Sequence, residues 1–139
     1  MTGCYFDSSV VLRYVLNQPE QLRLNRLECE ALTSEITAVE CRRVLDRLRL
    51  QGASDADALL LRHESLARFL AGVLMQPLGR AVLLRAAEPL EVPLGTLDAI
   101  HLATALRWHE ERERALTFAT HDRTLARAAR LYGLEVLGL

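Results

Sequence analysis

The sequence contains no lysine, so its 17 basic residues are all arginine. This absence excludes enzymes that depend on a lysine amine: P-loop nucleotide hydrolases, protein kinases, and the Schiff-base and pyridoxal phosphate enzymes. No G-x-G-x-x-G segment is present, so a dinucleotide-binding fold has no support. The 18 acidic residues bring the net charge to −1, so no global positive field attracts nucleic acid.

Cysteine and long apolar runs are also scarce. The cysteines Cys4, Cys29 and Cys41 are odd in number, and no two have C-x-x-C spacing, so we expect buried thiols in a reducing cytoplasm instead of a disulfide framework or a zinc site. The longest apolar run, Phe69 to Met75, is far shorter than the roughly 18 residues that cross a bilayer. Charged residues interrupt the N-terminal apolar residues, so we expect no signal peptide and no membrane association.

The composition is that of a soluble globular protein. Half of the 139 residues are apolar, a quarter are charged and only 5% are aromatic, so one domain over residues 1–139 buries a core made mostly of Leu, Val and Ala. No internal repeat, linker or low-complexity segment divides it.

Strands alternate with helices along the chain. Apolar runs predict strands at 3–6, 31–34, 73–76, 116–120 and 135–139. Periodicity predicts helices at about 10–17, 21–30, 37–50, 55–70, 79–87, 97–113 and 121–132. The expected helix N-caps are Ser8 or Ser9, Thr37, Ser54, Thr96 and Thr120. Alternation without hairpin turns indicates an α/β fold with a parallel sheet, which binds ligands at the carboxyl ends of its strands.

Acidic residues follow several of these strands. Asp7 and Asp122 come after the strands at 3–6 and 116–120, and Glu40 lies in the first turn of the helix after 31–34. They are therefore expected at the carboxyl edge of the sheet, whereas Asp98 follows an irregular loop and its position is left open. Each acid has a purely structural alternative. Asp7 suits an N-cap, Glu40 completes a capping box with Thr37, and the other two suit the positive end of a helix dipole.

If these carboxylates converge, they repel one another and provide the hard oxygen ligands that Mg²⁺ or Mn²⁺ prefers. A divalent ion held in this way activates water and clamps phosphate oxygens, which is the chemistry of metal-dependent nucleases. His101, three residues after Asp98, could approach such a site, although a histidine with satisfied hydrogen bonds or facing solvent is the expectation.

Four segments resemble one family. YFDSSVVL is similar to the opening strand and first Asp of PIN-domain ribonucleases, and LTSEITAVECRRVL to the block with their Glu. LGTLDAIHLATAL is the most specific segment, and LTFATHDRTLARAARLYGLEVL resembles the closing block with its T-x-D motif. The four blocks occur in the family's order over nearly the whole chain. The chain thus resembles PIN-domain ribonucleases, and more narrowly the VapC-type toxins of toxin–antitoxin pairs.

This resemblance implies a three-layer α/β/α sandwich around a parallel sheet of four or five strands. It implies a Mg²⁺-dependent endoribonuclease, with Mn²⁺ as an alternative, that cleaves cellular RNA and is silenced by a small antitoxin protein. The family's catalytic acids match Asp7, Glu40, Asp98 and Asp122, of which Asp7 and Asp98 match metal ligands. Asp122 would hold the metal directly or through water, and Thr120 would support the site from behind. Homodimers are usual in the family.

Two other functions remain open: a PIN-like nuclease outside any toxin pair, acting in RNA processing or on DNA, and a non-catalytic interaction module whose acids are only helix caps. Two groups of arginines flank the expected acidic centre, namely Arg42, Arg43, Arg47 and Arg49, and Arg123, Arg127 and Arg130. They either contact phosphates or form a solvated face with ion pairs.

Overall fold

The structure is a computed structural model that describes residues 1–139. Its strands are β1 (Gly3–Phe6), β2 (Glu30–Ser34), β3 (Leu74–Gln76), β4 (Leu116–Ala119) and β5 (Glu135–Leu137). Its helices are α1 (Ser8–Val15), the 3-10 turn η1 (Leu24–Arg26), α2 (Glu35–Leu50), α3 (Ala56–Ala71), α4 (Arg80–Ala86), α5 (Thr96–Arg112) and α6 (Arg123–Leu131). None of these helices has the length and apolar character needed to cross a bilayer.

All five strands lie in one parallel sheet with the order β3-β2-β1-β4-β5. The central strand β1 is buried along its whole length, as expected of a parallel strand covered on both faces. Its residues pair in register with β2 and β4, Cys4 lying opposite Ala31 on one side and Thr117 on the other. The predicted α/β fold with a parallel sheet of four or five strands is confirmed.

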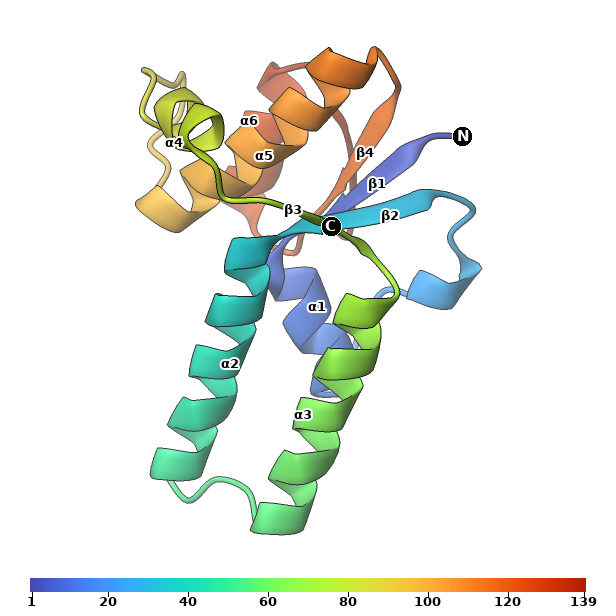
Figure 1. The fold of residues 1–139 in the computed structure, drawn as a ribbon, viewed down its shortest axis with the longest axis vertical. Coiled ribbons are helices and arrows are strands. Elements are labelled where there is room, and N and C mark those ends of the chain that lie inside the picture. Colours follow the sequence, from blue (N-terminus) through green and yellow to red (C-terminus); the bar gives the residue numbers. More distant parts are fainter.

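Helices cover both faces of the sheet (Figure 1). Tyr5 packs in a core cluster with Trp108 of α5 and Leu125 of α6, whereas its neighbours Cys4 and Phe6 pack in a second cluster with α1, α2 and α3. Successive side chains of a strand point to opposite faces, so β1 contributes to both cores. The long helices α2 and α3 form a hairpin that projects away from the sheet (Figure 1).

The helix starts differ from the predicted ones because aspartate and earlier residues act as caps. Side-chain caps are supplied by Asp7, Ser34, Asp55 and Asp122, and Gly95 precedes α5. The predicted caps Ser8 or Ser9, Thr37, Ser54, Thr96 and Thr120 are therefore wrong. Aspartate accepts from the helix backbone as well as serine does, so sequence alone does not choose between adjacent candidates.

The predicted helix at 21–30 is also wrong, since the segment holds the three-residue turn η1 and the first residue of β2. Just before this segment, Glu20 has a φ of 62°, a left-handed conformation that does not continue a right-handed helix. Leu22, Leu24 and Leu27 are partly buried against the α1–α3 core. Packing of these leucines against the core thus fixes an irregular segment whose apolar residues mimic a helical pattern.

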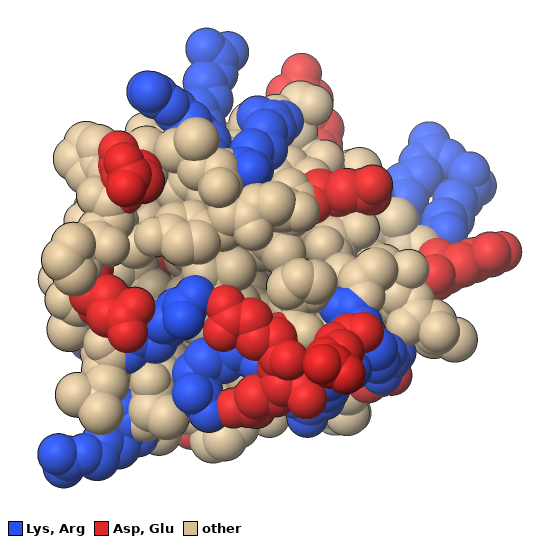
Figure 2. Space-filling view, turned by 90° about the horizontal axis from the view of Figure 1, so that it is seen from above, with Lys and Arg blue, Asp and Glu red and all other residues tan.

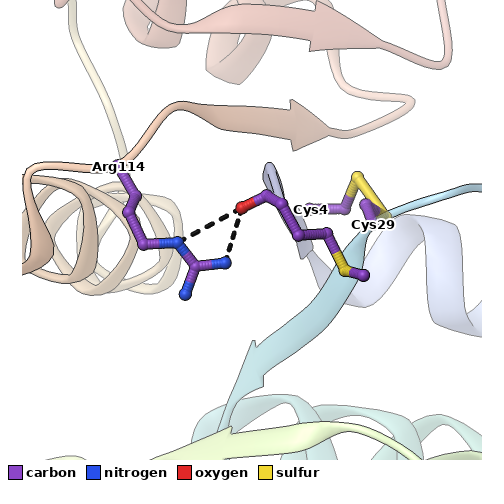
Figure 3. The surroundings of a disulfide bond; sticks show 4 residues. Cys4, Cys29 and Arg114 are labelled. Atoms are coloured by element: carbon purple, nitrogen blue, oxygen red, sulfur yellow. Dashed lines mark hydrogen bonds between the residues drawn. A yellow bond between two sulfur atoms is a disulfide. The ribbon is translucent and has the colours of Figure 1, made fainter.

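Cys4 and Cys29 form a disulfide, with their Cα atoms 5.8 Å apart (Figure 3). The expectation of three free thiols is wrong for this pair, because the pairing of β1 with β2 brings together residues that are 25 apart in sequence. Nearby, the Arg114 guanidinium donates to the Met1 carbonyl oxygen (Figure 3). Cys41 remains a free buried thiol, and burial, together with Glu40 and Asp7, raises its pKa to about 12.

Candidate functional site

Asp7 lies at the carboxyl end of the central strand β1 and is only 3% exposed. Its Oδ1 accepts hydrogen bonds from the Val10 N–H at 3.1 Å and the Ser9 hydroxyl at 2.6 Å. The Thr120 hydroxyl donates to the other oxygen, Oδ2. Asp7 is thus a helix cap, as one alternative predicted, and it is also held from both sides at the edge of the sheet where ligands bind.

The segment after β4 continues this network. The Asp122 N–H donates to Thr120 Oγ1 at 3.0 Å, and the His121 N–H donates to Ser9 Oγ at 2.9 Å. Asp122 caps α6 through Oδ1, which accepts from the Leu125 N–H at 2.8 Å. The carboxyl ends of β1 and β4 are therefore joined by hydrogen bonds, and Asp122 Oδ2 accepts none.

Glu40 approaches the same edge from α2. Because Ser34 caps this helix, Thr37 lies within it, and the predicted capping box is wrong. Glu40 Oε1 instead accepts from the Ser8 hydroxyl at 2.7 Å and from His101 Nε2 at 2.6 Å. Burial alone would raise the pKa of Glu40, but the hydrogen bond and charge of His101, together with Ser8, outweigh it and lower that pKa.

Asp98 lies in the first turn of α5 and is half-buried. Its carboxylate accepts no hydrogen bond. Its pKa is raised by burial first, then by Asp122, Asp7 and Glu40, while His101 opposes the rise. Asp98 lies one helical turn before His101, which bonds Glu40, and the charges of the other three acids reach it. The four predicted acids therefore converge at one edge of the sheet, including the one whose position the sequence left open.

The convergence does not amount to a preformed metal cluster, since no group of three His, Cys, Asp or Glu side chains has the geometry to hold an ion. The donor set nevertheless fits a divalent cation. Asp98, Glu40 Oε2 and Asp122 Oδ2 accept no hydrogen bond, and carboxylate oxygens are the ligands that Mg²⁺ and Mn²⁺ prefer. A cation here would relieve the repulsion that raises the pKa of Asp98.

The two arginine groups differ in their partners. On α2, Arg43 and Arg49 both pair with Asp46, at 2.9 and 2.8 Å. On α6, the exposed arginines form no ion pair; these are Arg123, Arg127 and Arg130. The ion-pair alternative thus holds for part of α2, and α6 offers free guanidinium groups beside Asp122. Charges of both signs also mix over the face shown in Figure 2.

Sequence reasoning missed Tyr5 and gave the approach of His101 to the acids only as the less expected alternative. Tyr5 is fully buried, and its hydroxyl lies 2.6 Å from His101 Nδ1. His101 is 1% exposed and bonds Glu40, so its hydrogen bonds are satisfied and it also approaches the acids, as the alternative allowed. Two features of the sequence pointed to these residues. Side chains alternate between the two faces of the sheet along β1, which contains Tyr5, and His101 lies one helical turn after Asp98.

Comparisons with known proteins give the family. The model of the PIN domain matches residues 4–131. None of the curated proteins matches significantly.

Solved structures show the same fold at low identity. VapBC2 from Rickettsia felis, determined with a DNA fragment from its promoter, has a TM-score of 0.69 and 13% identity, over 98% of each chain. FitAcB from Neisseria gonorrhoeae has a TM-score of 0.61 and 20% identity, over 96% of each chain. PAE2754 from Pyrobaculum aerophilum has a TM-score of 0.65 and 18% identity, over 97% of this chain and 83% of the other. With this fold, with four acids at its carboxyl edge and with a family match over most of its length, the chain belongs to the PIN domain family.

Proposed function

We propose that this protein is a Mg²⁺-dependent endoribonuclease, with Mn²⁺ as an alternative ion, that acts as the toxin of a toxin–antitoxin pair. The observation that carries the proposal is the convergence of Asp7, Glu40, Asp98 and Asp122, with the repulsion felt by Asp98. Helix caps alone need no such convergence, because a cap acts on the backbone of its own helix. Membership of the PIN family supports hydrolysis, since PIN domains are generally nucleases.

In this proposal Asp7 and Asp98 hold the ion, and Asp122 binds it directly or through a water molecule. When bound, the ion lowers the pKa of a water molecule and neutralises charge on the scissile phosphate. Thr120 and Ser9 fix the Asp7 carboxylate by donating to its two oxygens. Their bonds keep the ligand oriented before substrate arrives.

Glu40 and the α6 arginines act on the substrate side. Glu40 Oε1 is held by two donors, so Oε2 is the oxygen that orients the attacking water. Arg123 and Arg127 are exposed on α6 after Asp122, where guanidinium groups bind RNA phosphates as charge-assisted donors. Such local contacts suffice even though the whole chain has a net charge of −1.

The toxin role is supported by likeness to structures of toxin–antitoxin complexes, VapBC2 and FitAB, both of which were determined with DNA. We propose that a small antitoxin protein binds and silences this chain, and that the chain forms a homodimer. The other possibilities, a nuclease outside a toxin pair and a non-catalytic module, become outcomes of the test below.

The test combines induced expression with cleavage by the purified protein. We expect growth arrest on induction, rescue by a small protein encoded beside this chain, and cleavage of single-stranded RNA that requires Mg²⁺ or Mn²⁺ and stops with EDTA. Asp7→Asn should abolish cleavage, while Glu64→Gln, which removes an exposed and unpaired charge on α3, should not. Metal-dependent cleavage without toxicity would point to a nuclease outside a toxin pair. Wild-type protein without any metal-dependent cleavage would refute the nuclease.

A further inference from the structure

A chain of buried polar groups runs from the central strand to Glu40. The Tyr5 hydroxyl lies 2.6 Å from His101 Nδ1, and His101 Nε2 lies 2.6 Å from Glu40 Oε1. Ser8 Oγ closes the chain, at 3.1 Å from Nε2 and 2.7 Å from Oε1. Tyr5, Ser8 and His101 are all buried, so water does not compete for these bonds.

The direction of the hydrogen bonds is fixed at the Glu40 end of this chain. An ionised carboxylate only accepts hydrogen bonds, so His101 Nε2 carries a proton and donates it to Glu40 Oε1. Nδ1, at the other side of the ring, bonds the Tyr5 hydroxyl.

This arrangement makes the two oxygens of Glu40 different. Both donors, Ser8 and His101, bond Oε1, and Oε2 accepts no hydrogen bond. The carboxylate is therefore held by one oxygen and presents the other. The ring of His101 is itself fixed at both nitrogens, and Tyr5 is fixed by stacking on Phe118 with ring centroids 5.2 Å apart.

We propose that Tyr5 and His101 are positioning residues that fix Glu40 through Oε1 and leave Oε2 to face the site. This positioning role rests on the proposed function as a metal-dependent nuclease, because only in that function does the orientation of Glu40 matter. Groups that hold a functional side chain in this way typically change affinity or activity by 10- to 100-fold when they are replaced.

Two replacements of His101 separate positioning from simple packing. His101→Gln places an amide N–H near Nε2, so it keeps a donor for Glu40. His101→Asn places its amide near Nδ1, so it keeps the side towards Tyr5 and loses the donor. Both remove the ring and leave space in the same core, which makes each the control for the other. His63→Asn, on the exposed face of α3, controls for the substitution itself.

We expect His101→Asn to lower kcat about 10- to 100-fold with little change in KM. We expect His101→Gln to stay within about threefold of wild type, and Tyr5→Phe to fall between the two, because it removes one hydroxyl and leaves the ring. Equal losses in the two His101 variants would overturn the proposal, since packing alone would then explain them.

A measurement without metal or RNA distinguishes this proposal from the proposed function. In spectra of protein with ¹⁵N-labelled histidine, wild type should give a downfield, slowly exchanging Nε2–H proton of His101, identified by its loss in His101→Gln. Glu40→Gln should shift this signal. If it is missing from wild type, the positioning chain is wrong even if RNA is cleaved normally. If the signal is present but wild type neither cleaves RNA nor responds to metal, the proposed function fails and the positioning role fails with it.

Discussion

Asp98→Asn should make the protein more stable in the absence of divalent metal. The carboxylate accepts no hydrogen bond that the amide would lose, and burial and three other acids raise its pKa. A group whose folded pKa lies above its unfolded pKa costs stability once pH exceeds the unfolded value. The ionised side chain therefore weakens the fold at neutral pH, and replacing it with a neutral one removes that cost.

Two opposing effects set the magnitude. Asp98 lies in the first turn of α5, where the helix dipole favours a negative charge by about 0.3–1 kcal/mol. Burial and repulsion by the other acids, which raise the pKa of Asp98, act against this gain. Because the group is half-exposed and screened by solvent, we expect a net gain of no more than about 1 kcal/mol, or roughly 2–4 °C in Tm.

Divalent metal should make wild type more stable than Asp98→Asn, which reverses their order of stability in EDTA. At a free concentration of about 100 times Kd, an ion that binds only the folded state adds roughly 2.7 kcal/mol. Wild type should gain this stabilisation, and the variant, which lacks one ligand, should gain much less. Thermal melts at pH 7 with EDTA and with Mn²⁺ measure both differences. The advantage of the variant in EDTA should also shrink as pH falls and wild-type Asp98 becomes protonated.

The matched control is Asp57→Asn, which removes an exposed acid from the first turn of α3. It should lower stability by a few tenths of a kcal/mol through the helix dipole, equally with and without metal. If Asp98→Asn is less stable than wild type in EDTA, or if the order is the same with metal, the assignment of Asp98 to a repulsive metal site is wrong.

Three further predictions concern other parts of the molecule. Glu40→Gln keeps an oxygen for both of its donors, so the free energy of unfolding should stay within about 1 kcal/mol of wild type, while RNA cleavage should fall at least tenfold, or about 1.4 kcal/mol; normal cleavage would remove Glu40 from the site. Reductant should lower the stability of the oxidised protein by about 3.5 kcal/mol, the scale for a closed loop of this length, and Cys29→Ser should show no such response; a wild-type melt unaffected by reductant would contradict the disulfide. Arg127→Ala should reduce the slope of log affinity for RNA against log salt by about 0.7, whereas Arg49→Ala, which breaks a pair with Asp46, should not; equal slopes in all three proteins would place RNA elsewhere.

The sequence predicted the strands and the acids that follow them because both depend on local patterns. Asp7 comes directly after a short apolar run, where β1 ends and α1, which Asp7 caps, begins. The parallel order of the strands followed from alternation with helices, which needs no knowledge of distant contacts.

The features that the sequence did not predict all depend on contacts between residues that are distant along the chain. The loop before α5 has no regular pattern, so the approach of Asp98 to the other acids appears only in three dimensions. The disulfide joins residues 25 apart, and three cysteines allow several pairings. His101 and Glu40 are 61 residues apart, and a buried histidine has no sequence signal that distinguishes a polar partner from an apolar one.

The sheet ends on both sides in strands of only three residues, β3 and β5. Short edge strands offer few unpaired backbone groups, so they are poor templates for the addition of a strand from another chain. A second protein that joins this one by extending its sheet would gain little backbone bonding on either side. Stable association therefore has to come from helix faces, and the same short edges protect the folded protein against strand-to-strand aggregation.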